Sequence, residues 1–225
     1  MSRLRSYGQY CGLAQALEII GERWALLIVR DLVLGPKRFT DLRTGLPRIP
    51  TNVLSARLKE LEAAGVVHRR TMPRPSAAVA YELTAYGSEL EEVVLHLGRW
   101  GAKSLGDPKP EDIVTIDGEV LALRATFKED AARGANARHQ LQVAEVIVHA
   151  IVNDGALTAG DGPLPDADLV MRTDALDGLK LLLSRDISAT EAIASGLFTV
   201  EGSIAEFERF VDLFGADTQA ATAPA

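Results

Sequence analysis

The sequence predicts an α+β protein with two domains, and two observations support this fold class. The first is the order of periodic segments before residue 84: two helices, a short helix, a turn, a longer helix and two strands. The second is charge. Residues 1–105 hold 15 Lys and Arg against 10 Asp and Glu, a net of +5, whereas residues 106–225 hold 9 against 21, a net of −12. A basic domain followed by an acidic one is typical of a nucleic-acid-binding domain joined to one that does not contact nucleic acid.

Composition excludes several other classes of protein. Cys11 is the only cysteine, so an internal disulfide is impossible and a reducing cytoplasm is the expected compartment. The first residues lack the apolar stretch of a signal peptide, and no run of about 18 apolar residues exists. We therefore expect a cytoplasmic protein that does not contact membranes.

Apolar residues at helical spacing predict the first part of the basic domain. They recur at positions 13, 17, 20, 24, 27 and 28, with Gly21 as a break between two helices and Gly35-Pro36 as the end of the second. Positions 39, 42 and 46 then mark a short amphipathic helix. Pro47 ends it, because proline restricts the residue before it and donates no N–H.

The next helix is predicted from Thr51 to Ala64 and has two distinct faces. Leucines 54, 58 and 61 share one face with Gly65, whereas Asn52, Ser55, Ala56 and Lys59 lie on the opposite face. A Thr at the N-terminus and a Gly at the C-terminus suit the two caps of this helix. The polar face is available for a partner outside the domain core.

A hairpin and a last apolar helix complete the basic domain. Val66–Arg70 and Val79–Leu83 are predicted strands, joined by the proline-stiffened loop Met72–Ala78. Thr84 is expected to cap a helix with apolar positions between Leu90 and Trp100. Helix, turn, helix and basic hairpin in this order fit a winged helix-turn-helix, which inserts its second helix into the DNA major groove.

The acidic half is predicted to fold as a smaller layered α/β domain. Residues 106–110 are a plausible linker, because charge and composition change there. We expect one or two strands at 113–123, two strands at 138–152 around residues 143–145, strands at 168–173 and 198–202, and helices at 125–133, 174–183, 188–195 and 203–214. Asn153–Gly155 has strong hairpin chemistry, and the glycines from Gly155 to Gly162 indicate a turn. The predicted domains are 1–105 and 111–215, with a flexible tail at 216–225.

Seven residues are the candidates for contact with duplex DNA: Arg38, Arg43, Thr51, Asn52, Ser55, Lys59 and Arg74. Asn pairs bidentately with adenine, and Lys contacts guanine or a phosphate. Arg38 and Arg43 flank the short helix and suit phosphates, while Arg74 at the tip of the hairpin suits a minor groove. Arg57 lies nearer the core and is assigned a structural or phosphate role. The alternative is that the polar face is an ordinary solvated helix face.

Residues from about Cys11 to Gly101 resemble the HxlR-type winged-helix transcriptional regulators. The resemblance lies in residues 11, 16–24, 27–32, 35, 38–42, 54–62, 65–67, 81–84, 87 and 100–101, with the spacing intact. It implies a bacterial homodimer that binds palindromic operator DNA and responds to small molecules or oxidants. Gly12, Pro50 and Asn52 depart from the usual family residues, so the operator sequence does not transfer.

Residues from about Glu145 to Phe214 resemble sterol carrier protein-like domains. The resemblance lies in residues 167–174, 179–183, 191–192, 196–202 and 207–214. It implies a sheet covered by helices around an apolar tunnel, and a hydrophobic small-molecule effector bound by Met171, Leu181, Leu183 and Phe198. The alternative is that these four side chains belong to an ordinary packed core.

The function expected from these observations is a homodimeric DNA-binding transcriptional regulator, with hydrophobic-ligand control as a further expectation. A lipid or metabolite carrier that uses the winged helix for dimerisation is the alternative. Cys11 is a candidate redox sensor or an inert small residue. The four histidines lack metal-ligand spacing, and no phosphate loop, dinucleotide fingerprint or nucleophile motif is present. We therefore expect no enzyme activity, no metal and no cofactor.

Overall fold

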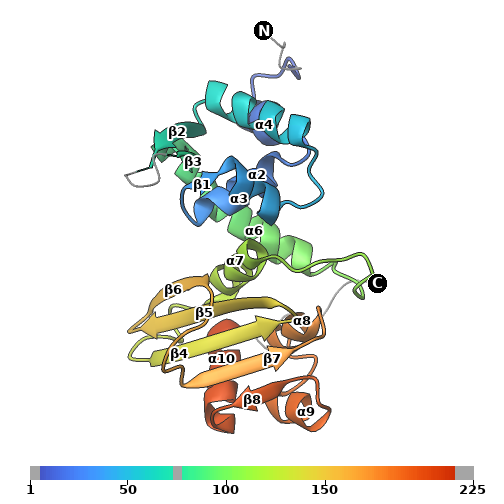
Figure 1. The fold of residues 1–225 in the computed structure, drawn as a ribbon, viewed down its shortest axis with the longest axis vertical. Helices are drawn as coiled ribbons and strands as arrows, with labels where there is room; N and C mark the ends of the chain where they lie inside the picture. The colour runs from blue at the N-terminus through green and yellow to red at the C-terminus, as the bar shows by residue number, and fades with distance from the viewer. Residues whose placement is uncertain (1–5, 73–77, 216–225) are drawn as a thin grey trace. The chain divides into compact units, whose positions relative to one another are not determined.

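The computed structural model describes residues 6–72 and 78–215 of the chain (Figure 1). Its residues group into two compact units, Met1–Val94 and Leu95–Ala225, each of which is described below by itself. The unit boundary falls inside helix α6, earlier than the linker expected at 106–110. The functional domain limits 1–105 and 111–215 stay a prediction, and the tail 216–225 lies outside the described residues. No helix among the described residues is long and apolar enough to cross a membrane.

The first unit contains helices packed around a small sheet, as the sequence predicts. Its elements are α1 (Gly12–Ile20), α2 (Ala25–Val33), β1 (Lys37–Arg38), α3 (Phe39–Gly45), α4 (Thr51–Ala63), β2 (Val67–Thr71), β3 (Val79–Leu83) and α5 (Ala85–Ser88), followed by the start of α6 (Leu90–Ala102). The strands pair antiparallel in the order β1-β3-β2. The two-residue strand β1 was not expected. It exists because Lys37 and Arg38 pair with Tyr81 and Ala80 of the hairpin.

Helices α3 and α4 form the helix-turn-helix, and leucines hold them in the core. Leu42 on α3 and Leu54, Leu58 and Leu61 on α4 are almost completely buried. The carbonyl of Leu46 accepts a hydrogen bond from the Ile49 N–H, which closes the turn between the helices. Burying an aliphatic side chain of this size contributes about 1.5–3 kcal/mol. The leucine stripe therefore fixes which side of α4 faces the core.

The two ends of α4 differ in how well the sequence predicted them. The N-cap is Pro50 rather than Thr51, because the Pro50 carbonyl accepts the first helical hydrogen bond, from Leu54. At the other end Gly65 has a φ of +72°, and the Val66 N–H reaches back to the Leu61 carbonyl. This arrangement is a Schellman cap, which favours glycine at that position. The predicted C-terminal glycine cap is confirmed, and the predicted Thr51 cap is wrong.

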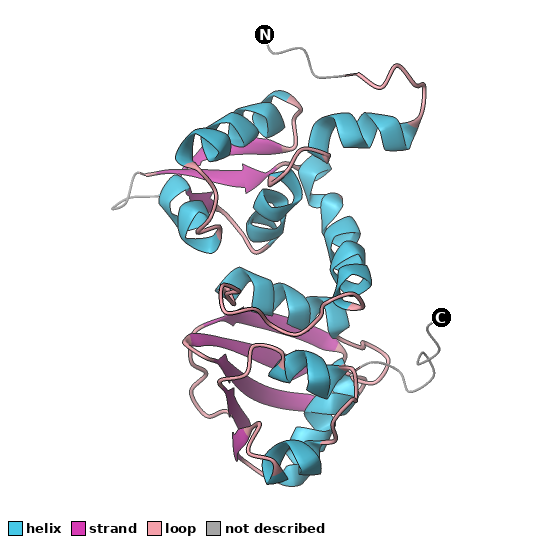
Figure 2. Ribbon diagram, turned by 90° about the vertical axis from the view of Figure 1, so that its right-hand side faces the viewer, coloured by secondary structure: helices cyan, strands magenta, loops and turns pink. Residues whose placement is uncertain are grey.

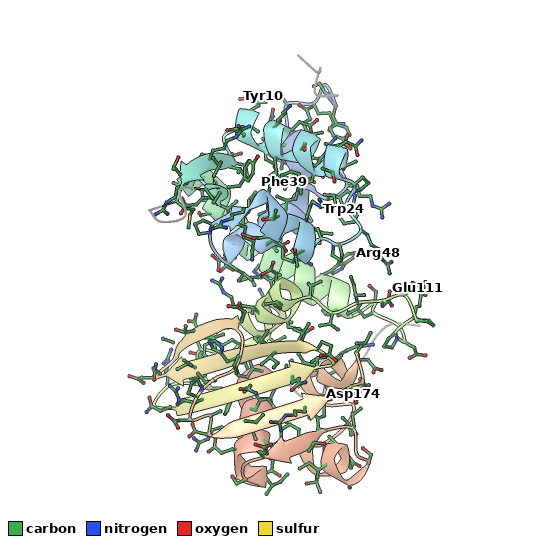
Figure 3. The ribbon with its side chains drawn as sticks, in the orientation of Figure 1. Tyr10, Trp24, Phe39, Arg48, Glu111 and Asp174 are labelled. Atoms are coloured by element: carbon green, nitrogen blue, oxygen red, sulfur yellow. The ribbon has the colours of Figure 1, made fainter. Side chains whose placement is uncertain are left out.

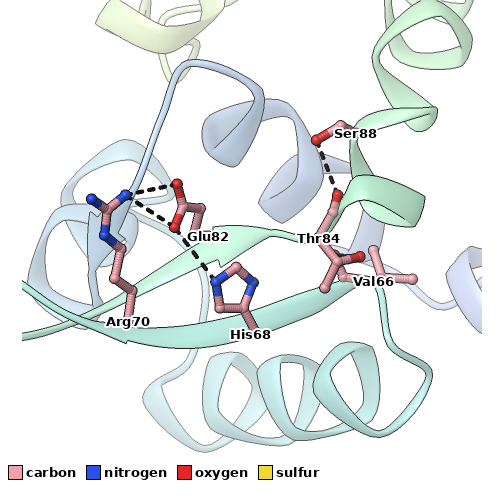
Figure 4. A network of polar contacts seen from close by, with 6 residues as sticks. All are labelled: Val66, His68, Arg70, Glu82, Thr84 and Ser88. Carbon is pink, nitrogen blue, oxygen red and sulfur yellow. Dashed lines mark hydrogen bonds and ion pairs between the residues drawn. The ribbon is translucent and has the colours of Figure 1, made fainter.

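Thr84 joins the hairpin to the helices that follow it (Figure 4). Its hydroxyl donates to the Gly65 carbonyl at 2.6 Å and accepts from the Gly87 N–H at 3.0 Å. The hydroxyl of Ser88 donates to the Thr84 carbonyl. Thr84 therefore caps α5, and the single helix expected after it is divided into α5 and α6.

The second unit is a five-stranded sheet with helices. Its elements after α6 are α7 (Ile116–Thr126), β4 (Asn136–Val143), β5 (Val146–Asn153), β6 (Ala156–Asp161), β7 (Leu169–Thr173), α8 (Gly178–Leu183), α9 (Ala189–Ala194), β8 (Thr199–Glu201) and α10 (Ile204–Phe214). The strand order is β6-β5-β4-β7-β8, in which β4 and β7 are parallel and the other pairs are antiparallel. In the side view of Figure 2 the strands of this unit lie on one side and α8, α9 and α10 on the other.

An aromatic cluster fills the space between this sheet and α10. Phe210 stacks on Phe214 with ring centroids 4.8 Å apart, and Phe198 packs on Phe207 at 5.7 Å. All four rings are at most 2% exposed. His139 on β4 is buried against the edge of Phe210, and burial lowers its pKa even though Glu206 lies 3.6 Å away. The core is therefore built from aromatic rings and one imidazole whose neutral form burial favours.

The loop that connects β6 to β7 crosses the face of the sheet opposite the aromatic cluster. Gln140 accepts a hydrogen bond from the Leu164 N–H at 2.9 Å, and Nδ1 of His149 lies 3.1 Å from the Gly162 carbonyl oxygen. Arg138 donates to the carbonyls of residues 165 and 166. Side chains of β4 and β5 thus hold this loop against the strands.

Three predictions for the second unit are wrong. Residues 116–126 form helix α7 rather than strands, and the expected helix 125–133 is mostly a series of turns. The glycine-containing stretch 156–161 is strand β6 rather than a turn. A Cβ at Gly160 would lie 2.9 Å from Nε2 of His149 on the neighbouring strand, so a larger residue there would displace the imidazole. The hairpin at Asp154 and Gly155, both with positive φ, is confirmed.

We predict that Gly87→Ala destabilises the first unit. An added Cβ would lie 2.0 Å from the Val66 carbonyl oxygen, so backbone must move. Overpacking of this kind costs about 1–3 kcal/mol or more. Gly98→Ala on α6 is the matched control, because its Cβ would have nothing within 4 Å, and it should be neutral or stabilising. Urea unfolding of both variants measures the difference. Equal midpoints for Gly87→Ala and the unmodified chain would contradict the packing described here.

We also predict that Glu119→Gln stabilises the protein at alkaline pH but not at acid pH. Oε2 of Glu119 is buried without a partner among the described residues, and burial raises the pKa of this carboxyl from 4.5 to about 7. Below pH 4.5 both folded and unfolded states are protonated, so no penalty arises. Between pH 4.5 and about 7 the Glu119 carboxyl ionises in the unfolded state only. The free energy of unfolding therefore falls by at most about 3 kcal/mol over this range. Urea unfolding at pH 4.5 and 8 measures this. Exposed Glu145→Gln is the control, and an equal effect of Glu119→Gln at both pH values would contradict the prediction.

Candidate nucleic-acid interface

The polar face of α4 lies opposite its buried leucines. Thr51, Asn52 and Lys59 are exposed, and Ser55 is half-buried. The side chains of Asn52 and Lys59 make no hydrogen bond or ion pair with any described residue. An amide and an ammonium group on one exposed helical face can therefore donate to base edges or phosphates.

Basic residues of α3 and the turn lie beside this helix in the chain. The Asp41 carboxylate accepts the backbone N–H of Arg38 at 2.9 Å, so the start of α3 is capped while the Arg38 side chain stays exposed. Arg43 is exposed in the last turn of α3. Arg48 is exposed in the turn before α4 and is labelled in Figure 3. Arg48 was not among the DNA-binding residues predicted from the sequence, although a basic residue between the two helices was a usable signal.

Acidic neighbours compensate the basic residues of strand β2 in the β2–β3 hairpin, which is the wing of this fold. Arg70 lies 3.0 Å from Glu82, and His68 lies 3.5 Å from the same carboxylate (Figure 4). Arg69 lies 3.2 Å from Glu62, with its guanidinium over the Tyr81 ring. Arg74 lies outside the described residues. Among the residues described, the exposed Arg43 of α3 and Lys59 of α4 are therefore better suited to phosphates than Arg69 and Arg70.

Arg57 has the structural surroundings expected from its position on the helix. It is half-buried and pairs with Glu60 at 2.5 Å on the same helix. Its other carboxylate neighbour is Glu22, at 3.9 Å. An arginine held by two carboxylates is less available to a phosphate than the exposed Lys59.

Cys11 is exposed at the N-cap of α1. Backbone hydrogen bonds from Ala14 and Leu13 lower the pKa of its thiol. A lowered pKa raises the thiolate fraction at neutral pH, which favours reaction with oxidants. Its role as a redox sensor stays a prediction.

The four predicted effector residues lie in or beside the aromatic core of the second unit. Met171 and Phe198 are at most 2% exposed, Leu183 is buried and Leu181 is half-buried. Phe198 is in contact with Phe207. Met171 lies on β7, Leu181 and Leu183 lie on α8, and Phe198 directly precedes β8. Their role in binding a ligand stays a prediction.

The described residues carry no group of three or more His, Cys, Asp or Glu side chains that could hold a metal ion.

The first unit is a winged helix-turn-helix. Helix α3, the turn and α4 are followed by the β2–β3 hairpin, and β3 of this hairpin also pairs with β1. The fold class expected from the sequence is confirmed for this unit, and α+β describes the second unit.

Comparison with known proteins identifies the family. The profile of the HxlR-like helix-turn-helix matches residues 19–109. An uncharacterised HTH-type transcriptional regulator of Bacillus subtilis, YdeP, is 39% identical over 93 residues, which cover 41% of this chain and 73% of YdeP. The HTH-type transcriptional regulator YodB of the same organism is 36% identical over 40% of this chain and 79% of YodB. The chain belongs to the HxlR family.

A solved structure of an enzyme is also among the proteins to which the chain is similar. The sec-alkylsulfatase Pisa1 from Pseudomonas sp. is 19% identical, and the match covers 47% of this chain and 17% of the sulfatase, with a TM-score of 0.42. The sterol carrier-like identity of the second unit stays a prediction.

Proposed function

We propose that this protein is a homodimeric transcriptional regulator that binds operator DNA through α4. The observation that carries the proposal is the exposed face of α4, where Asn52 and Lys59 have no partner among the described residues. It is supported by membership of a family whose relatives are named as HTH-type transcriptional regulators. The same function was expected from the sequence.

The dimensions of α4 suit a major groove. An α-helix with its side chains is about 10–12 Å across, which fits a groove about 12 Å wide, and the 13 residues of α4 span about 20 Å along it. Residues near the N-terminus of a recognition helix reach base edges, which is where Thr51 and Asn52 lie. Asn52 would read a base, and Lys59, two turns later, would contact a base or a phosphate.

Arg38, Arg43 and Arg74 would hold the DNA backbone. Arg38 is the N-cap of α3 and Arg43 lies in its last turn, and this first helix crosses the backbone in helix-turn-helix complexes. Each phosphate neutralised releases counterions, so affinity falls as salt rises. These contacts fix the position of α4 without reading sequence.

Exposed apolar side chains on two helices support a dimer. Val93, Leu97 and Trp100 recur at helical spacing on α6 and are 42%, 44% and 71% exposed. Leu13 and Leu17 on α1 are 68% and 42% exposed. A monomer in water would leave these surfaces uncovered, whereas a symmetric partner would bury them.

The second unit would regulate DNA binding through an effector. A hydrophobic molecule bound among Met171, Leu181, Leu183 and Phe198 is the form of control expected from the sequence. Such a ligand regulates only if it has different affinities for the DNA-competent and DNA-incompetent dimers. Oxidation of Cys11 is a separate possible input, at an exposed thiol with a lowered pKa.

We predict that Asn52→Ala relaxes sequence preference, whereas Arg43→Ala weakens binding to all sequences. The probe is duplex DNA selected by the protein from a random pool, compared with a scrambled duplex in mobility shift. Loss of one base contact should reduce discrimination by about 1–3 kcal/mol. Loss of one phosphate contact should lower the slope of log affinity against log salt by about 0.9. Arg133→Ala, an exposed change in the second unit, is the control. Equal loss on both duplexes for Asn52→Ala would remove its base-reading role.

We predict that the DNA-binding form is a dimer and that Leu97→Glu makes it a monomer. A charge placed on the exposed apolar stripe of α6 would have to be desolvated in the interface. Light scattering of the unmodified chain should give twice its 24.2 kDa mass, and footprinting should show two half-sites about 34–36 Å apart. Glu208→Gln on the exposed side of α10 is the control. A monomer at micromolar concentration with one protected half-site would overturn the dimer.

A further inference from the structure

One row of side chains crosses three neighbouring strands of the second unit. Gln142 on β4 pairs in register with Arg172 on β7, and Arg172 pairs with Thr199 on β8. Paired residues in a sheet project to the same face. The preceding register row contains Leu141 and Met171, which are buried on the opposite face. The row therefore lies on the face away from the aromatic core.

This row forms part of a hollow with a volume of about 400 Å³. The rest of its lining includes Asp174, directly after β7, and Gly196 and Leu197, in the segment between α9 and β8. Figure 3 labels Asp174 at the carboxyl end of β7, beside α8. Pockets for small molecules have volumes of about 300–1,000 Å³. The hollow is therefore of a size to hold a small metabolite.

Arg172 supplies hydrogen-bond donors with a positive charge. Its Nη1 donates to Oε1 of Glu201 at 2.6 Å, and this ion pair holds the guanidinium over the strands. No contact to Nε or Nη2 of Arg172 is found among the described residues. Because a guanidinium has five N–H donors in a planar fork, the remaining ones match a carboxylate.

Gln142 and Asp174 supply acceptors. Nε2 of Gln142 donates to the Ala144 carbonyl at 3.0 Å, which fixes the orientation of the amide and leaves Oε1 as an acceptor. Asp174 adds an exposed carboxylate on the same hollow, and Leu197 adds a half-buried apolar surface. One cation beside two carboxylates, counting Glu201, disfavours a polyanion such as a nucleotide. The polar row disfavours the chain of a fatty acid.

We propose that this hollow binds a free α-amino acid with an aliphatic side chain. Its carboxylate binds Arg172, its ammonium group binds Asp174 and Oε1 of Gln142, and its side chain lies against Leu197. The site lies on the opposite face of β7 from Met171, so it is distinct from the core site expected for a hydrophobic effector. It does not depend on DNA binding.

The test is calorimetry of the full chain without DNA, so that its outcome is separate from that of DNA binding. The panel is the L-amino acids, followed for the best binder by its deaminated carboxylate and its decarboxylated amine, with a fatty acid alongside. An aliphatic amino acid should bind with a Kd below about 1 mM, and both analogues should bind at least about ten-fold more weakly. No binding by any amino acid, or binding by the fatty acid alone, would overturn the proposal.

Three variants test which side chain of the protein binds which group of the amino acid. Arg172→Gln should weaken the amino acid about ten-fold, and Glu201→Gln should tighten it, because the guanidinium loses a competing carboxylate. Asp174→Asn should weaken the amino acid about ten-fold and leave the deaminated carboxylate unchanged. Arg133→Gln, an exposed ion-paired arginine in the same unit, is the matched control. Because Asp174 is exposed, its variant remains informative if Arg172→Gln fails to fold. Unchanged affinity in Asp174→Asn would overturn the proposal.

Discussion

Burial of Leu54, Leu58 and Leu61 fixes the rotation of α4 about its own axis, and the proposed DNA interface depends on that rotation. Three buried leucines contribute roughly 5–9 kcal/mol, which is more than any polar contact on the opposite face can offset. Asn52 and Lys59 are consequently directed away from the core before any DNA is present. The glycine cap at Gly65 ends the helix and turns the chain into the hairpin. Recognition by a preformed helix avoids the entropic cost of ordering that helix on binding.

Among the described residues, carboxylates compensate the basic side chains of the β2–β3 hairpin, but they do not compensate Arg43 of α3 or Lys59 of α4. Glu62 and Glu82 hold Arg69 and Arg70 on the hairpin, whereas Arg43 on α3 and Lys59 on α4 are exposed. Counting basic residues in the sequence does not distinguish these four residues. They are distinguished by the ion pairs between the two strands and between α4 and β2, which become visible only in the structure. Residues 106–225, with their net charge of −12, gain nothing from proximity to phosphate. The contribution that we propose for the second unit is ligand binding, for which its two sheet faces offer different chemistry.

The first unit was predictable because its elements are encoded by local periodicity. Leucines at helical spacing, Pro47 after a short helix and Gly65 at a cap each act within a few residues. Strand β1 was missed because two residues become a strand only by pairing with the distant Tyr81 and Ala80. In the second unit, residues 116–126 mix β-branched and helix-forming residues, and packing of α7 beside β5 and β6 decides for the helix. Strand β6 was hidden by its glycine, and the row of Gln142, Arg172 and Thr199 follows from strand order and register, which no local pattern specifies.

Site-specific photo-crosslinking tests the central claim, that the exposed face of α4 contacts DNA, most directly. A photoreactive phenylalanine analogue would replace Asn52 in one sample and Glu208, an exposed residue of α10, in another. Both would be irradiated with duplex DNA that the unmodified protein selects from a random pool. The account predicts a covalent protein–DNA adduct from position 52, mapped to a base within the protected site, and none from position 208. Equal crosslinking from both positions, or none from position 52 in a variant that still shifts the DNA, would contradict it.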